Sequence, residues 1–120
     1  MVESVVLRLP RRLPSQNRFH YRHWSIYRKE RDAWFLLLRQ HLPPRPTPPT
    51  PVARRLIIRS YRTRLCDYAN LVGGAKPIPD CLIRLGYLQD DSPKWFSCSY
   101  EQFQVAAAEE RTEVEFPDGI

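Results

Sequence analysis

The alternation of apolar and polar residues predicts a series of strands interrupted by helical segments. Short runs rich in β-branched, aliphatic and aromatic residues indicate strands. The last run alternates cleanly, with Thr112, Val114 and Phe116 on one face and glutamates between them. The four predicted strands cover residues 2–9, 52–61, 95–104 and 111–116.

Residues 23–42 have a different period, because their apolar side chains recur at the spacing of one helical face. This stripe consists of Trp24, Tyr27, Trp34, Leu38 and Leu42. We therefore expect a long amphipathic helix with a basic opposite face and with Ser25 as its N-cap. A second, shorter helical segment is expected at residues 80–85, ended by Gly86.

Turn-forming residues separate these elements. Residues 11–22 are irregular and basic, and the Gly73-Gly74 step indicates a flexible turn. Residues 43–51 contain six prolines, which favours an extended connector over a docking ligand for another protein. The predicted order is β-α-β-α-β-β, an α/β (α+β) fold in which residues 1–120 form a single domain on one mixed sheet.

Charge divides the chain into two halves. The net charge of +6 is the sum of +12 in residues 1–64 (15 Lys and Arg, 3 Asp and Glu) and −6 in residues 65–120 (4 against 10). A basic surface attracts nucleic-acid phosphates, although solvated faces of an ordinary domain would give the same charge. We expect no membrane span, and three widely spaced cysteines indicate a reduced, cytoplasmic protein without a zinc site.

Within the acidic half, four aspartates and a lysine form the candidate chemistry. Asp67 follows a predicted strand, and Asp90 and Asp91 follow the short helix that returns across it, so we expect them to meet. Hard cations such as Mg²⁺ take carboxylate ligands, and Lys76 could offset charge on a phosphate. Each residue also has a structural interpretation: Asp80 suits the first turn of a helix, Asp90 and Asp91 an ordinary turn, and Lys76 an exposed surface.

The order of these residues resembles the RusA family of Holliday junction resolvases, most closely its phage-type members. The resemblance covers about residues 9–102 and rests on short motifs. They are Leu13-Pro14-Ser15-x-Asn17, His23-Trp24, Asp67-x-x-Asn70-Leu71, Lys76, Asp80-x-Leu82, Gly86 and Asp90-Asp91-Ser92.

The resemblance implies a homodimer that binds four-way DNA junctions in the bacterial cytoplasm and cuts two strands with Mg²⁺, or Mn²⁺, and no small-molecule cofactor. It assigns catalysis to Asp67, Lys76 and Asp91, and metal binding to Asp67 and Asp91, with Asp80 and Asp90 as further ligands or supports. Expected DNA contacts are Arg11, Arg12, Asn17, Arg18, Arg22, Arg62, Arg64 and Asn70.

One position departs from the family pattern. Ala69 stands where the pattern has its second aspartate, and a methyl group cannot bind a metal. Either Asp80 or Asp90 substitutes for the lost carboxylate, or the protein binds junctions and cuts them poorly, or the sequence is a deliberately inactivated variant.

Overall fold

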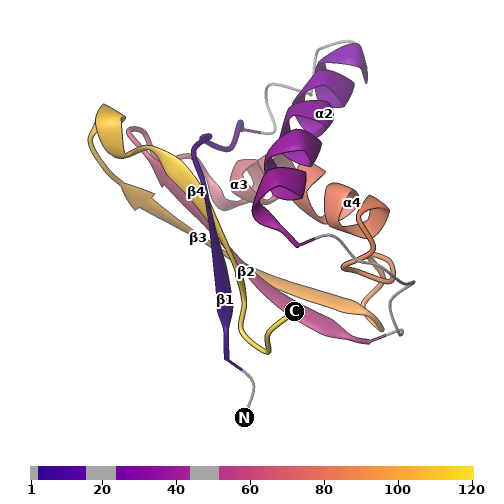
Figure 1. Cartoon of the computed structure of the whole chain (residues 1–120). Helices are drawn as coiled ribbons and strands as arrows, with labels where there is room; N and C mark the ends of the chain where they lie inside the picture. The colour runs from indigo at the N-terminus through magenta and orange to yellow at the C-terminus, as the bar shows by residue number, and fades with distance from the viewer. Residues whose placement is uncertain (1–2, 16–23, 44–51) are drawn as a thin grey trace.

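The fold is a mixed sheet with all of its longer helices on one face (Figure 1). The computed structural model describes residues 3–15, 24–43 and 52–120. In chain order, the elements are β1 (Val5–Leu9), α2 (Trp24–His41), β2 (Arg54–Arg62), α3 (Tyr68–Gly74), α4 (Pro77–Arg84), β3 (Phe96–Gln104), the 3₁₀ turn η1 (Ala107–Glu109) and β4 (Arg111–Phe116).

Strand pairing gives the four-stranded order β1-β4-β2-β3. β4 is antiparallel to both β1 and β2, whereas β2 and β3 are parallel. Because parallel neighbours need a crossover connection, α3 and α4 carry the chain from the end of β2 back to the start of β3. The expected α/β (α+β) class, with a mixed sheet and a long amphipathic helix, is confirmed.

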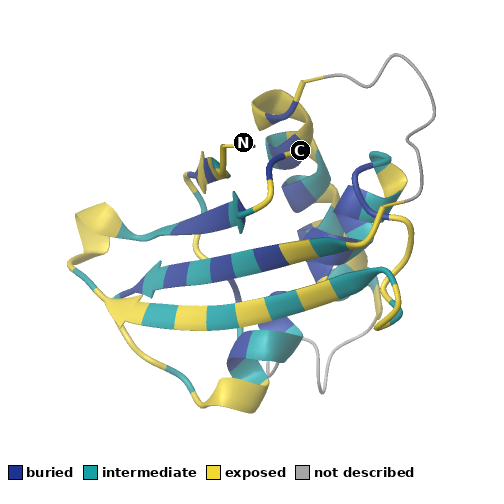
Figure 2. Ribbon diagram, turned by 90° about the horizontal axis from the view of Figure 1, so that it is seen from below, coloured by how far each residue is buried: buried dark blue, intermediate teal, exposed yellow. Residues whose placement is uncertain are grey.

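The period of the strands decides which face is covered. Along β2, Leu56 and Ile58 are buried under the helices, whereas Arg55 is exposed and Ile57 and Arg59 are half-buried on the open face. Figure 2 shows this banding along β2 and β3. The open face is polar: Arg59 bonds Glu115 at 2.7 Å and Glu101 at 3.1 Å.

The core lies between the sheet and α2 and α4, which pack against each other. From α2, Trp34 and Leu38 are fully buried. Glu30 is also buried, and Arg11 bonds its carboxylate at 2.9 Å, so the segment after β1 is tied to the helix. Among the described helices, none has the length and apolar character needed to cross a membrane.

The structure corrects several expected boundaries. Ser25 lies inside the first turn of α2 and does not cap it, because the helix already begins at Trp24. α4 begins at Pro77 and not at Asp80, since proline is well suited to the first helical position. Its predicted end is right: Gly86 follows the cap with a φ of 84°, a conformation that favours glycine.

Helix α3 was not expected, and it includes the Gly73-Gly74 step that indicated a flexible turn. Gly74 is buried and helical because the chain passes very close to it. A Cβ atom at this position would lie 1.8 Å from the carbonyl oxygen of Pro14. The glycine therefore allows close packing of the Pro14 and Ser15 backbone against α3.

Replacing Gly74 with alanine should destabilise the protein. The added methyl group must displace the Pro14 backbone, so we expect Gly74→Ala to lower the free energy of unfolding by about 2 kcal/mol in urea titrations. Gly73→Ala, one residue earlier in the same helix, is the matched control and should be neutral or stabilising by up to about 1 kcal/mol. Equal effects of the two substitutions would contradict the close contact.

Candidate functional site

Asp67 caps helix α3 through its side chain. Its Oδ1 accepts the backbone N–H of Asn70 at 2.9 Å, and its Oδ2 accepts the side-chain amide of the same residue at 2.8 Å. The cap satisfies one of the free N–H groups at the start of the helix and orients the carboxylate. Asp67 nevertheless stays exposed.

The surface around this cap is open and mixed in character. Arg64, Tyr68 and Ala69 are exposed, and Asn70 is half-buried. We call these residues, with Asp67, the α3 corner. Because Ala69 is exposed in the first turn of α3, an aspartate there would meet no packing obstacle and would lie close to Asp67 in the helix.

Lys76 and Asp80 form a second group, at the start of α4. The Lys76 ammonium lies 3.5 Å from Asp80 Oδ2, and the Tyr27 hydroxyl from α2 donates to the same oxygen. Partial burial, and then the contact with Asp80, raise the pKa of Tyr27 above its ordinary value. Asp80 is therefore held by a lysine and a tyrosine, an arrangement that joins α4 to α2.

Asp90 and Asp91 lie in the exposed turn before β3. The Ser92 backbone N–H bonds Asp90 Oδ1 at 2.6 Å, and this bond keeps the pKa of the Asp90 carboxyl below its ordinary value. Asp90 therefore forms the ordinary turn that was the structural alternative for this residue. Ser92 in turn accepts the N–H of Phe96, so the turn is fixed to the first residue of β3.

The strand topology places Asp67 and Asp91 at opposite ends of the sheet. Asp67 follows the carboxyl end of β2, whereas Asp91 precedes the amino end of β3, and these strands are parallel in register from Arg54↔Phe96 to Arg62↔Gln104. Eight residues of strand span roughly 26 Å. Figure 1 shows the orange start of β3 beside the start of β2, at the end of the sheet opposite to η1. The expected meeting of Asp67 with Asp91 therefore does not occur within one chain.

Nor do the described residues of the chain form a complete metal site. Within residues 3–15, 24–43 and 52–120, no three His, Cys, Asp or Glu side chains are grouped so that they could hold a metal ion. Asp67 is adjacent to an amide and Asp80 to a cation and a phenol. Each of these carboxylates could therefore offer Mg²⁺ a single ligand, whereas the sequence predicts a site built from four aspartates.

Several of the expected DNA-binding arginines have partners inside the protein. Arg62 is buried and bonds the carbonyls of Arg64 at 2.8 Å and Leu13 at 3.5 Å, so it positions backbone. Arg12 lies 3.5 Å from Glu110 and remains half exposed. Arg64 presents an exposed side chain at the α3 corner. The predicted contacts Asn17, Arg18 and Arg22, and most of the proline connector, lie outside the described residues.

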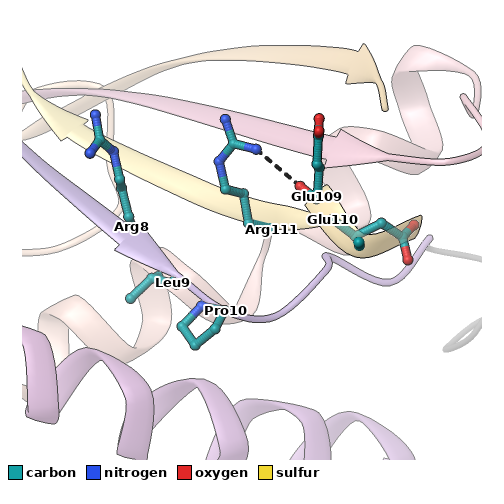
Figure 3. A pocket seen from close by; sticks show the side chains of 7 residues that line it. Arg8, Leu9, Pro10, Glu109, Glu110 and Arg111 are labelled. Atoms are coloured by element: carbon teal, nitrogen blue, oxygen red, sulfur yellow. Dashed lines mark hydrogen bonds between the residues drawn. The ribbon is translucent and has the colours of Figure 1, made fainter. Parts of the chain in front are cut away.

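A pocket of about 340 Å³ lies elsewhere, between β1 and the turn before β4 (Figure 3). Its lining includes Arg8, Glu109, Glu110 and Arg111. Arg111 donates to the Glu109 carbonyl at 3.0 Å, and both arginines pair with Glu113. Because none of the predicted catalytic residues lines this pocket, it is separate from the candidate site.

The sequence analysis did not predict two features of the basic surface. Trp24 is 61% exposed, and the guanidinium of Arg28 lies 4.4 Å from its ring centroid. Their spacing of four residues on a helix could have indicated this pair. Lys94 and Arg54 line a smaller hollow of about 100 Å³ beside the Asp91 turn, and only the strand pairing brings them together.

Comparison of the chain with protein-family models and with curated proteins found no match. The RusA-type assignment of these residues therefore stays a prediction from the sequence.

Asp67 has a structural role that can be separated from a chemical one. Asp67→Ala should lower the free energy of unfolding by about 1 kcal/mol, because an N-cap acceptor is lost, whereas Asp67→Asn keeps a capping oxygen and should be close to the wild type. Thermal unfolding followed by circular dichroism measures both. If alanine proved as stable as asparagine, the cap would contribute nothing.

Proposed function

We propose that the chain is a structure-specific endodeoxyribonuclease that acts on four-way DNA junctions in a bacterial cytoplasm, with Mg²⁺ as the implied cation. The observation that carries this proposal is the α3 corner, where an exposed aspartate oriented by Asn70 lies in the same short segment as the exposed Arg64. An arginine can hold a DNA phosphate while a carboxylate takes part in the chemistry.

The order of the acidic and basic residues adds support. Asp67, Asn70, Lys76 and Asp91 follow the RusA pattern, and Pro14 packs against Gly74 so that the phage-type Leu13-Pro14-Ser15 motif lies beside α3. The described part of the basic loop that is expected to bind DNA therefore passes beside the helix that Asp67 caps. No side chain of the proposed site is expected to form a covalent intermediate, so water would attack the phosphate directly.

A second function is favoured by Ala69. The missing aspartate removes a carboxylate where the α3 corner is open to solvent, and a single protomer gathers no acidic trio among its described residues. A protein of this kind would bind junctions by their shape and charge and would cut them poorly. Both functions share the DNA-binding step and differ only in cleavage.

Cleavage separates the two functions. Wild-type protein with a synthetic four-way junction and Mg²⁺ or Mn²⁺ should nick opposing strands, and Asp67→Asn should reduce the rate at least about 100-fold while the fold stays intact. Ala69→Asp should raise the rate, because it restores a carboxylate beside Asp67. Strand products are resolved on denaturing gels. Cleavage that Asp67→Asn leaves unchanged would exclude this site.

Measurements of junction binding test the contribution of Arg64. Arg64→Gln should weaken junction binding and reduce the slope of log affinity against log salt by about 1, as expected when one phosphate contact is lost. Arg8→Gln is the matched control, since Arg8 is also exposed but projects from the open face of the sheet, away from the helices. Gel shifts at several salt concentrations measure both, and equal losses would indicate only a general charge effect.

A further inference from the structure

We propose that the pocket between β1 and the turn before β4 binds a nucleotide, with its base between the guanidinium groups of Arg8 and Arg111. The pocket has a volume of about 340 Å³, near the lower end of the range for small-molecule sites, so it suits one nucleotide. None of the residues assigned to cleavage lines it, so this site is additional to the proposed function.

Arg111 is already held in one orientation. Its Nε donates to Glu113 Oε2 at 3.2 Å, and its Nη1 donates to the Glu109 carbonyl at 3.0 Å. Its guanidinium lies 3.8 Å from the ring centroid of Tyr61, which stacks in turn on Phe103 at 5.1 Å. A ligand that stacks on Arg111 therefore orders little side chain that is not ordered already, which favours binding.

The side of Arg111 that Tyr61 does not cover is the side of the pocket. In the strand order β1-β4-β2, Tyr61 lies on β2, to one side of β4, whereas Arg8 and Leu9 lie on β1, to the other side. Because Arg111 also lines the pocket, its β1 side can receive a flat ligand. Nucleobases stack favourably on guanidinium planes, so a base would extend the existing row of stacked side chains.

Arg8 is placed to cover the other face of the base. It faces Glu113 across the β1–β4 pair, so Arg111 is its diagonal neighbour. Diagonal neighbours lie roughly 7–8 Å apart, about twice the contact distance between flat groups, so one ring fits between them. The Arg8 side chain is 79% exposed and its Nε lies 3.7 Å from Glu113 Oε2, beyond hydrogen-bond distance, so it can turn towards a ligand.

Glu109 offers a carboxylate to the edge of the base. Figure 3 shows its side chain projecting to the same side as Arg8 and Arg111. It is exposed and forms no hydrogen bond or ion pair with the described part of the chain. Glu110, by contrast, accepts the Thr63 backbone N–H at 2.9 Å, and this bond holds the pKa of Glu110 below its ordinary value.

The charges of the pocket indicate which ligand it takes. Its lining carries two arginines, Arg8 and Arg111, and two glutamates, Glu109 and Glu110, so it does not suit a simple anion. A nucleotide has a phosphate for Arg8 and, in adenine, cytosine and guanine, an exocyclic amine that donates to a carboxylate. The pocket should therefore prefer bases with an amine.

The base contact can be tested with two nucleotides that differ at one group. Deoxyadenosine monophosphate (dAMP) should shift the amide signals of residues 8–10 and 107–111, and the Arg111 Nε–H signal, in ¹H–¹⁵N spectra. Deoxyinosine monophosphate (dIMP) has a carbonyl in place of the amine and should bind about tenfold more weakly. Glu109→Gln should bind both alike, because an amide can accept or donate.

Two substitutions test the arginines. Arg111→Lys keeps the charge but lacks the flat group, and Arg8→Gln lacks both, so each should weaken dAMP binding about tenfold. Arg55→Gln is the matched control, since Arg55 is an exposed, ion-paired arginine of the same face at the opposite end of β2. It should bind dAMP as the wild type does. Circular dichroism checks that each variant folds.

Three results would overturn the proposed site. They are the absence of shifts at residues 8–10 and 107–111 with dAMP up to about 10 mM, equal affinity of the wild type for dAMP and dIMP, and equal losses in Arg8→Gln and Arg55→Gln. None of them involves cleavage, so the nuclease proposal would stand. Conversely, a wild type that binds dAMP as described but cuts no junction would support the pocket while the proposed function fails.

The nucleotide could be free or part of a single strand, and a further titration separates these sources. Single-stranded oligodeoxyadenylate presents the same base and phosphate in a chain. If it shifts the same residues at lower concentrations than dAMP does, the natural ligand is a nucleotide within a DNA strand. If only dAMP shifts them, the ligand is a free nucleotide. Both results support the pocket, because the recognised groups are the same.

Discussion

The parallel pairing of β2 with β3 is the constraint on which the arrangement of this molecule depends. It requires a crossover, and the crossover is made of α3 and α4, which carry every acidic candidate from Asp67 to Asp80. Because the two strands are parallel, the crossover starts at one end of the sheet and finishes at the other. Both the position of the α3 corner and the distance of the Asp91 turn from it follow from this one topological fact.

Charge pairing explains the unequal halves of the sequence. Arginines of the basic half meet carboxylates of the acidic half across the sheet and around its edge, as in Arg59 with Glu115, Arg12 with Glu110 and Arg55 with Asp118. Many arginines of the basic half thus form ion pairs with carboxylates of the acidic half. Ion pairs that are exposed to solvent contribute little to stability. Arg64, near α3, is one of the arginines that stay exposed at the surface.

The periodic elements of this fold could be predicted, and the site geometry could not. Alternation identified β4, and Gly86 marked the end of α4. The sequence of α3, Tyr-Ala-Asn-Leu-Val-Gly-Gly, has weak helical preference, so the helix depends on its Asp67 cap, on the burial of Leu71 and on the contact of Gly74 with Pro14. The contacts of Asp80 with Tyr27 and of Arg11 with Glu30 join residues distant in sequence, and no local pattern encodes them.

Capping and chemistry are compatible at Asp67. Each carboxylate oxygen has two lone pairs, and Asn70 takes one acceptor position on each, so a further position on each oxygen stays open towards solvent. The hydrogen bonds hold the carboxylate in one orientation, as neighbouring groups do for metal-binding carboxylates. Ala69, by contrast, is exposed and supports neither cap nor core, so folding does not require alanine there. The residue at position 69 therefore bears on what the α3 corner can bind and not on whether the helix forms.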